Sequence, residues 1–303
     1  MGQDAKAVCK LCGSVIAALH PYENRVDWLE LEGPEALVGN IAAEVEKYEQ
    51  WAADQVIDPK RYIVDESVLE SWYSESRPKR WVLKRWPALA SVKGSRILDI
   101  GGSCLDSWRF LRRGAGRIDQ VEISPASQRL GLQRLDAALT NYHYQADWRK
   151  RICFHTSIAE SLPFQEEVFD IAFSRATIHH TQRPQSIEEI HRVLRANGLM
   201  FIIEPRLSLP FYGLMKLGRY LRRVDRGTDV PLRTAEIRSM RKLFQRVEWY
   251  PTGLGLSQLE WLVRRILRMP IRPMVTKLWE RRVGNILGLS YLTGNNCYIV
   301  AQK

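Results

Sequence analysis

Two acidic residues and a pair of glycines have the types and spacing that best define a chemistry in this sequence. Asp99 lies just before Gly101-Gly102, and Glu122 follows 23 residues after Asp99. Glycines let the backbone approach a ligand closely, because no Cβ stands in the way. A carboxylate at the end of a neighbouring strand can accept hydrogen bonds from both hydroxyls of a ribose, and an offset of about 20 residues is typical of such units. The spacing therefore predicts a site for a ligand that contains a nucleoside.

Short apolar runs on either side of the glycine turn would position these residues. Residues 96–100 form one run, residues 104–113 are compatible with a helix, and residues 118–123 form a second run that carries Glu122. The order strand, turn, helix, strand places both acids at one edge of a parallel sheet. The dinucleotide fingerprint G-x-G-x-x-G is missing from this stretch, which argues against a dehydrogenase.

The stretch resembles motif I of the class I S-adenosylmethionine (SAM) methyltransferases, D-x-G-x-G-x-G. Asp99 and Gly101 match this motif, whereas Ser103 and Leu105 stand at its second and third glycines. A longer block is similar to the ubiquinone/menaquinone-biosynthesis type (methyltransferase type 11) of this family, over residues 159–164, 168–174, 178–180, 189–194 and 197–205. The resemblance covers residues 96–205, and the second block is far more specific than motif I.

The resemblance implies SAM as the cofactor. It places Glu122 on the ribose, Asp99 and Gly101 around the methionine part, and Ile158 beside the adenine. The full set of residues expected at the cofactor is Asp99, Gly101, Gly102, Glu122, Ile158, Ala159 and Arg175. The family often has an acid at the place of Ile158, which bonds the adenine amine, whereas isoleucine can only pack there. This departure and the two in motif I leave weakened or altered SAM binding open.

His179 and His180 follow the fourth predicted strand, at residues 168–173, and so lie at its carboxyl end. Ligands bind outside this edge in open α/β sheets. A histidine there titrates near neutrality and can act as a general base, so both are candidate catalytic residues. The alternative is that the pair is a loop feature of the family with no proton-transfer role. His155 is expected to be structural.

The predicted activity is SAM-dependent methyl transfer to an oxygen or carbon of a small or lipid-like molecule. Adenine-N6 and related amino-methyltransferases carry an N-P-P-Y-like motif after the fourth strand, where this chain has Ser174-Arg175-Ala176-Thr177. We therefore expect nucleic acid not to be the substrate. No cluster of acids indicates a catechol-type magnesium site. The first alternative is a SAM-fold protein with lost or altered chemistry, such as a regulator or cyclase-like enzyme, and the second is an RNA methyltransferase.

Bulk composition favours a cytoplasmic protein. The 303 residues are 45% hydrophobic, enough for a sizeable core. No apolar run approaches the ~20 residues of a membrane span, and the start lacks a signal-peptide pattern. The five cysteines have no regular pattern, which indicates a reducing compartment. Cys9 and Cys12 form half of a zinc-ribbon signature, but a structural zinc needs four ligands, so a flexible or decayed N-terminus is the alternative.

The C-terminal third is strongly basic. From residue 206 to 303 the chain has 19 Lys and Arg against 6 Asp and Glu, a balance of +13. Aromatic and aliphatic residues alternate with these bases, as in helices that bind an anionic membrane surface at the inner membrane face. The alternative is that their apolar sides cover the sheet as a substrate lid while the arginines are solvated. RNA binding is a third interpretation without a supporting motif.

The expected architecture is α/β, with a Rossmann-like, mostly parallel sheet of seven strands and helices on both faces. Residues 1–92 are expected to be a mainly helical extension that could act as a lid. Residues 93–303 would form the SAM-binding domain, with basic amphipathic insertions at about 207–230 and 256–290. Ser186 and Glu189 read as a capping box that starts a helix, and Asn197-Gly198 as its end. The oligomeric state stays open.

Overall fold

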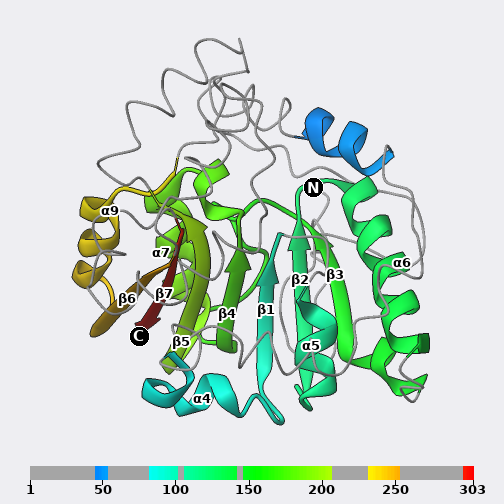
Figure 1. The fold of residues 1–303 in the computed structure, drawn as a ribbon, viewed down its shortest axis with the longest axis horizontal. Helices are drawn as coiled ribbons and strands as arrows, with labels where there is room; N and C mark the ends of the chain where they lie inside the picture. The colour runs from blue at the N-terminus through cyan, green and yellow to red at the C-terminus, as the bar shows by residue number, and fades with distance from the viewer. Residues whose placement is uncertain (1–44, 54–81, 102–105, 142–145, 207–230, 253–295) are drawn as a thin grey trace, which may run out of the picture.

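A seven-stranded sheet forms the centre of the computed structural model, which describes residues 45–53, 82–101, 106–141, 146–206, 231–252 and 296–303 (Figure 1). The strands lie in the order β3-β2-β1-β4-β5-β7-β6. Strand β7 is antiparallel to both of its neighbours, and every other pair is parallel. The predicted mostly parallel sheet of seven strands is confirmed. Its strands are β1 (Arg96–Ile100), β2 (Arg117–Glu122), β3 (Ile152–Thr156), β4 (Phe169–Arg175), β5 (Leu194–Pro205), β6 (Arg246–Thr252) and β7 (Asn296–Gln302).

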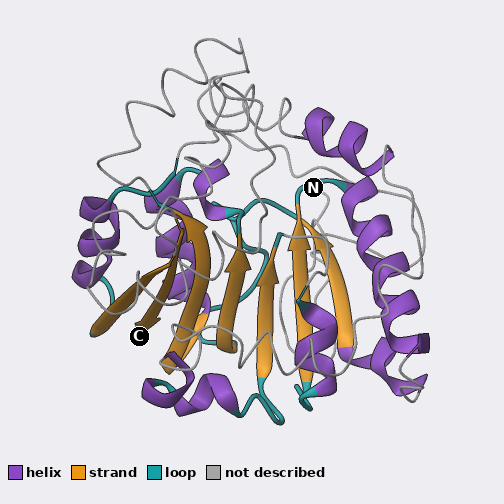
Figure 2. Ribbon diagram, in the orientation of Figure 1, coloured by secondary structure: helices purple, strands orange, loops and turns teal. Residues whose placement is uncertain are grey.

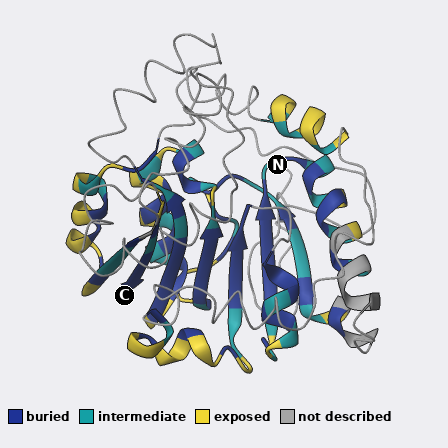
Figure 3. Ribbon diagram, in the orientation of Figure 1, coloured by how far each residue is buried: buried dark blue, intermediate teal, exposed yellow. Residues whose placement is uncertain are grey.

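Helices cover both faces of the sheet (Figure 2). On one face lie α7 (Arg183–Val193) and α9 (Thr234–Ser239), and on the other α4 (Pro87–Ala90), α5 (Ser107–Arg112) and α6 (Pro125–Asn141). Successive strand side chains point to opposite faces, so Leu98 joins the first core cluster and Ile97 the second. The central strands are therefore buried on both faces (Figure 3).

The described part of the N-terminal region contributes to this packing. Residues 45–53 and 82–85 are helical, and both lie in the extension over residues 1–92 for which the sequence predicts mainly helix. Val82 and Trp86 are buried in the same core cluster as Ile97, and Arg85 pairs with Glu248 of β6 at 2.9 Å. The segment before β1 is thus attached to the sheet. Cys9, Cys12 and the predicted basic insertions lie outside the described residues.

The prediction for the ends of α7 is wrong at both ends. The helix begins at Arg183, with Pro184 in its first turn, where the fixed φ of proline suits a helix start. Ser186 therefore lies inside the helix, and its Oγ lies 3.1 Å from the carbonyl oxygen of Gln182. The helix ends at Val193, so Asn197, with φ of 63°, adopts the left-handed conformation within β5 and not at a helix end.

The segment from residue 231 to residue 244 forms one short helix followed by a 3-10 turn. Helix α9 ends at Ser239, and a 3-10 turn, η5 (Met240–Lys242), follows it. Glu236 stabilises the start of α9 by accepting a hydrogen bond from the main-chain N–H of Arg233 at 2.6 Å. Ile237 and Phe244 are both buried in the core cluster that α7 covers, so α9 and η5 pack on the same face of the sheet as α7.

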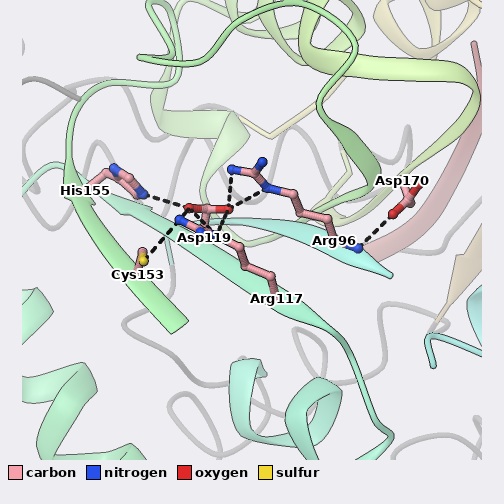
Figure 4. Close-up of polar contacts among 6 residues, drawn as sticks. All are labelled: Arg96, Arg117, Asp119, Cys153, His155 and Asp170. Atoms are coloured by element: carbon pink, nitrogen blue, oxygen red, sulfur yellow. Dashed lines mark hydrogen bonds and ion pairs between the residues drawn. The ribbon is translucent and has the colours of Figure 1, made fainter. Parts of the chain in front are cut away.

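A buried ionic cluster lies where β1, β2 and β3 run side by side (Figure 4). Asp119 is fully buried and pairs with Arg96 at 2.9 Å, with Arg117 at 3.1 Å and with Nε2 of His155 at 3.0 Å. Burial alone would raise the pKa of Asp119, but His155, Arg117 and Arg96 hold it well below its usual range. Arg117 also lies 3.2 Å from Cys153. The cluster ties three strands together, so His155 has the structural place that the sequence led us to expect.

Candidate functional site

The acid, glycine and histidine positions predicted from the sequence come together at one edge of the sheet. Gly101 follows β1, Glu122 ends β2, and His179 and His180 lie in the 3-10 turn η4 (Ile178–His180) after β4. These three strands are adjacent and parallel, so their carboxyl ends share an edge. This edge is where open α/β sheets bind ligands. Gly102 lies outside the described residues.

Gly101 is the point of closest approach between the first turn and the histidine turn. Its φ is 73°, and its N–H donates to the carbonyl of Val121 at 2.7 Å. A Cβ built on it would lie 2.8 Å from Cβ of Thr177 and closer still to the Thr177 hydroxyl. The position therefore requires glycine for two independent reasons, conformation and space.

Asp99 lies beneath this turn. The side chain is 3% exposed and accepts a hydrogen bond from the hydroxyl of Ser107, the first residue of α5. Burial, helped by the nearby carboxylates of Asp106 and Glu122, raises the pKa of Asp99 to about 8 against the lowering effect of the hydrogen bond from Ser107. Before any ligand binds, the Asp99 carboxyl is therefore largely protonated at neutral pH.

Glu122 occupies the position expected for a ribose acid. It is the last residue of β2, is 7% exposed, and accepts the main-chain N–H of Ile123 on Oε1 at 2.9 Å. Beyond the neighbouring strand β3 lie Ile158 and Ala159, both buried. A carboxylate beside an apolar pair suits a nucleoside, whose sugar is polar and whose base is flat and largely apolar.

The loop that carries Ile158 and Ala159 is fastened to α7. Arg192 donates to the carbonyls of Phe164 at 2.7 Å and Leu162 at 3.0 Å, and Glu189 accepts the N–H of Leu162 at 2.9 Å. Glu160 accepts the N–H of Gln182 at 2.7 Å, at the start of the same helix. Both ends of the loop are thus held in place relative to the histidine turn.

Arg175 ends β4 and points toward the start of α5. Its guanidinium lies 3.4 Å from the carboxylate of Asp106, which also pairs with Arg109. Asp106 is 2% exposed, whereas the Arg175 side chain is 41% exposed. Arg175 therefore neutralises a buried acid close to the glycine turn.

His179 and His180 differ in their surroundings. His179 is 5% exposed, and its Nδ1 lies 2.6 Å from Oε2 of Glu204. His180 is partly exposed; its ring lies 4.0 Å from that of His179 and 6.0 Å, edge to face, from Tyr48 of the helix at residues 45–53. Ala176, at the start of this turn, has a φ of 54°, which is unusual for a residue with a Cβ.

Three further residues, Glu204, Ser107 and Tyr48, contact the predicted site residues although no sequence motif gives them a role. Glu204 ends the apolar run of β5, as Glu122 ends that of β2. An acid at the carboxyl end of a buried strand is a signal that could have identified it. Ser107 and Tyr48 carry no comparable signal: neither follows an apolar strand, and Tyr48 meets a partner, His180, that is distant in sequence.

The residues at this edge fit a SAM molecule in chemical type. Glu122 can accept from ribose hydroxyls, Ile158 and Ala159 offer an apolar surface for an adenine, and Gly101 brings the backbone of the first turn close to the site. Among the described residues, no group of three or more His, Cys, Asp or Glu side chains could hold a metal ion. Nor does that part of the chain contain a helix long and apolar enough to cross a membrane.

Comparison with known proteins agrees with this assignment. Residues 98–202 match the family described as a methyltransferase domain. The ubiquinone/menaquinone biosynthesis C-methyltransferase UbiE of Ruegeria sp. (strain TM1040) is 33% identical over 132 residues, 43% of this chain and 49% of that protein. The enzyme of the same name from Roseobacter denitrificans is 33% identical over 119 residues, 38% of this chain and 44% of that protein. This chain thus spans about half the length of the curated relatives it matches.

A solved structure shares the fold. A chain in the complex between the Haloferax volcanii Trm112 methyltransferase activator and a methyltransferase gives a TM-score of 0.50 at 19% identity, over 84% of this chain and 97% of that one. Fold and site together define a class I SAM-dependent methyltransferase domain. Within that class, residues 98–202 match the methyltransferase-domain family, this part of the chain is similar to the ubiquinone/menaquinone biosynthesis enzymes, and the cofactor is SAM.

Proposed function

We propose that this protein transfers the methyl group of SAM to an oxygen or carbon of a small or lipid-like acceptor. The observation that carries the proposal is the convergence of Glu122, the Gly101 turn and the histidine turn at one sheet edge. The curated relatives named above are C-methyltransferases of quinone biosynthesis by name, which supports a lipid-like acceptor. Because the chain spans about half of their length, the acceptor is assigned here by class only.

The residues of the chain have separate roles in this proposal. SAM supplies an activated methyl group on a sulfonium. Glu122 binds the ribose hydroxyls, and Ile158 and Ala159 pack on the adenine. The Gly101 turn positions the methionine part, and Arg175 keeps the acid beside that turn neutralised. His179 and His180 lie where an acceptor would lose its proton. Alignment and exclusion of water then account for most of the rate.

Formation of S-adenosylhomocysteine with a panel of acceptors tests the proposal. We expect turnover with phenolic or quinol-like and isoprenoid acceptors and none with RNA or DNA. If the protein binds SAM but no acceptor class gives S-adenosylhomocysteine above background, methyl transfer is rejected in favour of a SAM-fold protein with altered chemistry. Turnover with RNA instead would support the second alternative.

Cofactor binding is expected to release a proton from Asp99. Its pKa of about 8 in the ligand-free protein means that the carboxyl is mostly neutral at pH 7. The ammonium and sulfonium of SAM favour the ionised form, so binding lowers this pKa and SAM affinity rises as pH increases toward 8, by at most about tenfold per pH unit. Calorimetry at pH 7 in two buffers with different ionisation enthalpies measures the proton count. In Asp99→Asn, the enthalpy of SAM binding should be the same in both buffers. If the two binding enthalpies differ as much as in the wild type, the proton comes from another group.

The basic C-terminal third is proposed to contact an anionic membrane surface, from which a lipid-like acceptor could be drawn. The support is the balance of +13 over residues 206–303. Each basic residue near an anionic leaflet contributes about 1 kcal/mol, so a few give weak, salt-sensitive binding. Flotation should recover the protein with anionic vesicles at low salt and not with neutral vesicles or at high salt. If the protein floats with neither vesicle at low salt, the lid interpretation replaces the membrane one.

A further inference from the structure

Glu204 holds the histidine turn through three hydrogen bonds. Its Oε1 accepts the main-chain N–H groups of Thr177 at 3.0 Å and Ile178 at 2.9 Å, and its Oε2 lies 2.6 Å from Nδ1 of His179. The side chain is fully buried at the end of β5. The turn between β4 and α7 is therefore folded around this one carboxylate, with the left-handed Ala176 at its start.

The geometry also decides which nitrogen of His179 carries a proton. An ionised carboxylate only accepts hydrogen bonds, so Nδ1 must be the donor to Glu204. Nε2 is then the nitrogen whose lone pair can take up a proton. Since Oε1 already serves two main-chain groups, Glu204 cannot turn away from the ring without losing the fold of the turn.

We propose that Glu204 is the positioning residue that makes His179, of the two histidines, the proton acceptor of the site; this rests on the methyl-transfer function proposed above. The acceptor is accordingly one whose oxygen or carbon must lose a proton, such as a phenol or an activated carbon acid. Its proton passes to Nε2 as a bond forms between the acceptor atom and the methyl carbon and the bond between that carbon and sulfur breaks. The positive charge lost by the sulfonium appears on the imidazolium, beside the carboxylate of Glu204, which stabilises it.

The fold contains an internal reference for this assignment. His155 contacts the buried carboxylate of Asp119 through Nε2, whereas His179 contacts the buried carboxylate of Glu204 through Nδ1. Asp119 is an ionised acceptor, so His155 carries a proton on Nε2. The two buried histidines are therefore expected to show protons on opposite nitrogens, and a change at one should leave the other unaffected.

Glu204→Gln tests the proposal. To keep both main-chain bonds, the amide oxygen must face Thr177 and Ile178, so its NH₂ faces His179 and Nδ1 becomes the acceptor. The proton of His179 then moves to Nε2, where it blocks proton uptake. The matched control is Glu236→Gln, which also removes a carboxylate that accepts a main-chain N–H; Glu236 pairs with Arg183 and bonds to neither histidine.

Nitrogen-15 NMR of the imidazole rings gives the decisive readout. We expect His179 protonated on Nδ1 in the wild type and on Nε2 in Glu204→Gln, with His155 unchanged in both. Turnover should fall by about 10²- to 10⁴-fold, mainly in kcat, and the acidic limb of the pH profile should disappear, while S-adenosylhomocysteine binding persists. Glu236→Gln should match the wild type in all of these measurements.

Several results would overturn the proposal. One is a wild-type His179 with an unprotonated Nδ1, which needs no variant to observe. Another is a folded Glu204→Gln that turns over at the wild-type rate, as a purely structural clamp would allow. Failure of the wild type to bind SAM or S-adenosylhomocysteine would instead refute the proposed function, whatever the state of His179.

Discussion

Replacing Asp119 with alanine is expected to lower the free energy of unfolding by about 3–5 kcal/mol, because it leaves buried charged partners without their counter-ion. Asp119 is fully buried, and the side chains of Arg96 and Arg117 are only 13% and 17% exposed. The loss is a large fraction of the ~5–15 kcal/mol that stabilises a typical domain. Urea unfolding followed by circular dichroism measures it, with the expectation of a lower midpoint at an unchanged slope.

Asp170→Ala is the matched control, because Asp170 also contacts Arg96 but is far more exposed. Its side chain is 36% exposed, pairs with Arg195 at 2.7 Å and accepts the main-chain N–H of Arg96 at 2.8 Å. We expect Asp170→Ala to lower the free energy of unfolding by at most about 2 kcal/mol. Equal losses in the two variants would contradict the account of the cluster in Figure 4.

The same cluster is expected to make the stability of the fold depend on pH. The pKa of Asp119 is depressed in the folded protein, so its contribution is fully present above the unfolded value of about 3.9 and is lost as pH falls toward the folded value. Between about pH 4 and pH 2, the wild type should therefore lose stability more steeply than Asp119→Ala. Parallel curves for the two proteins would show that the carboxylate does not carry this acid sensitivity.

Gly101→Ala is expected to disable the site. The left-handed backbone costs about 1–2 kcal/mol for a residue with a Cβ. The new methyl group also collides with the side chain of Thr177, which must move and take the histidine turn with it. Displacements of about 1 Å at a catalytic turn can reduce turnover by about 10²-fold. We expect a loss of that size in turnover, together with weaker SAM binding in calorimetry.

Gly94→Ala separates the two causes. Gly94 has nearly the same φ, 75° against 73°, but a Cβ there meets no atom within 4 Å. This variant should show the stability loss alone, with SAM binding unchanged. Adding Thr177→Gly to Gly101→Ala removes the colliding side chain and should restore part of the affinity. If Gly94→Ala and Gly101→Ala show the same stability and the same SAM affinity, the contact with Thr177 does not affect the site.

Much of the fold follows from local patterns in the sequence. The apolar runs around Leu98, Val121 and Phe173 are buried on both sides, as strands of a parallel sheet must be, and proline at the start of α6 marks its first turn. The start of α7 was predicted wrongly, because Ser186 and Glu189 have the spacing of a capping box but serve other partners. Ser186 bonds back into its own helix, and Glu189 holds the loop after β3.

The site was predictable where a side chain follows directly from a strand end, and not where it depends on contacts between distant residues. Glu122 and Gly101 lie where their spacing indicated. Glu204 could have been identified as an acid at the end of a buried strand, but its bond to His179, 25 residues earlier, is seen only in the folded structure. Tyr48 approaches His180 from a segment far earlier in the chain, and no local pattern reveals it. Likewise, only the folded structure shows that Asp99 is buried against Ser107.

The most direct test of the central claim is calorimetry with SAM and S-adenosylhomocysteine on the wild type and on Glu122→Ala. We expect the wild type to bind both ligands at one site per chain. Loss of the hydrogen bonds to the ribose hydroxyls, worth about 1.5–3 kcal/mol, should weaken binding by about 10- to 100-fold in Glu122→Ala. Failure of the wild type to bind either ligand would contradict a SAM site at this edge of the sheet, and unchanged affinity in Glu122→Ala would contradict the role assigned to its carboxylate.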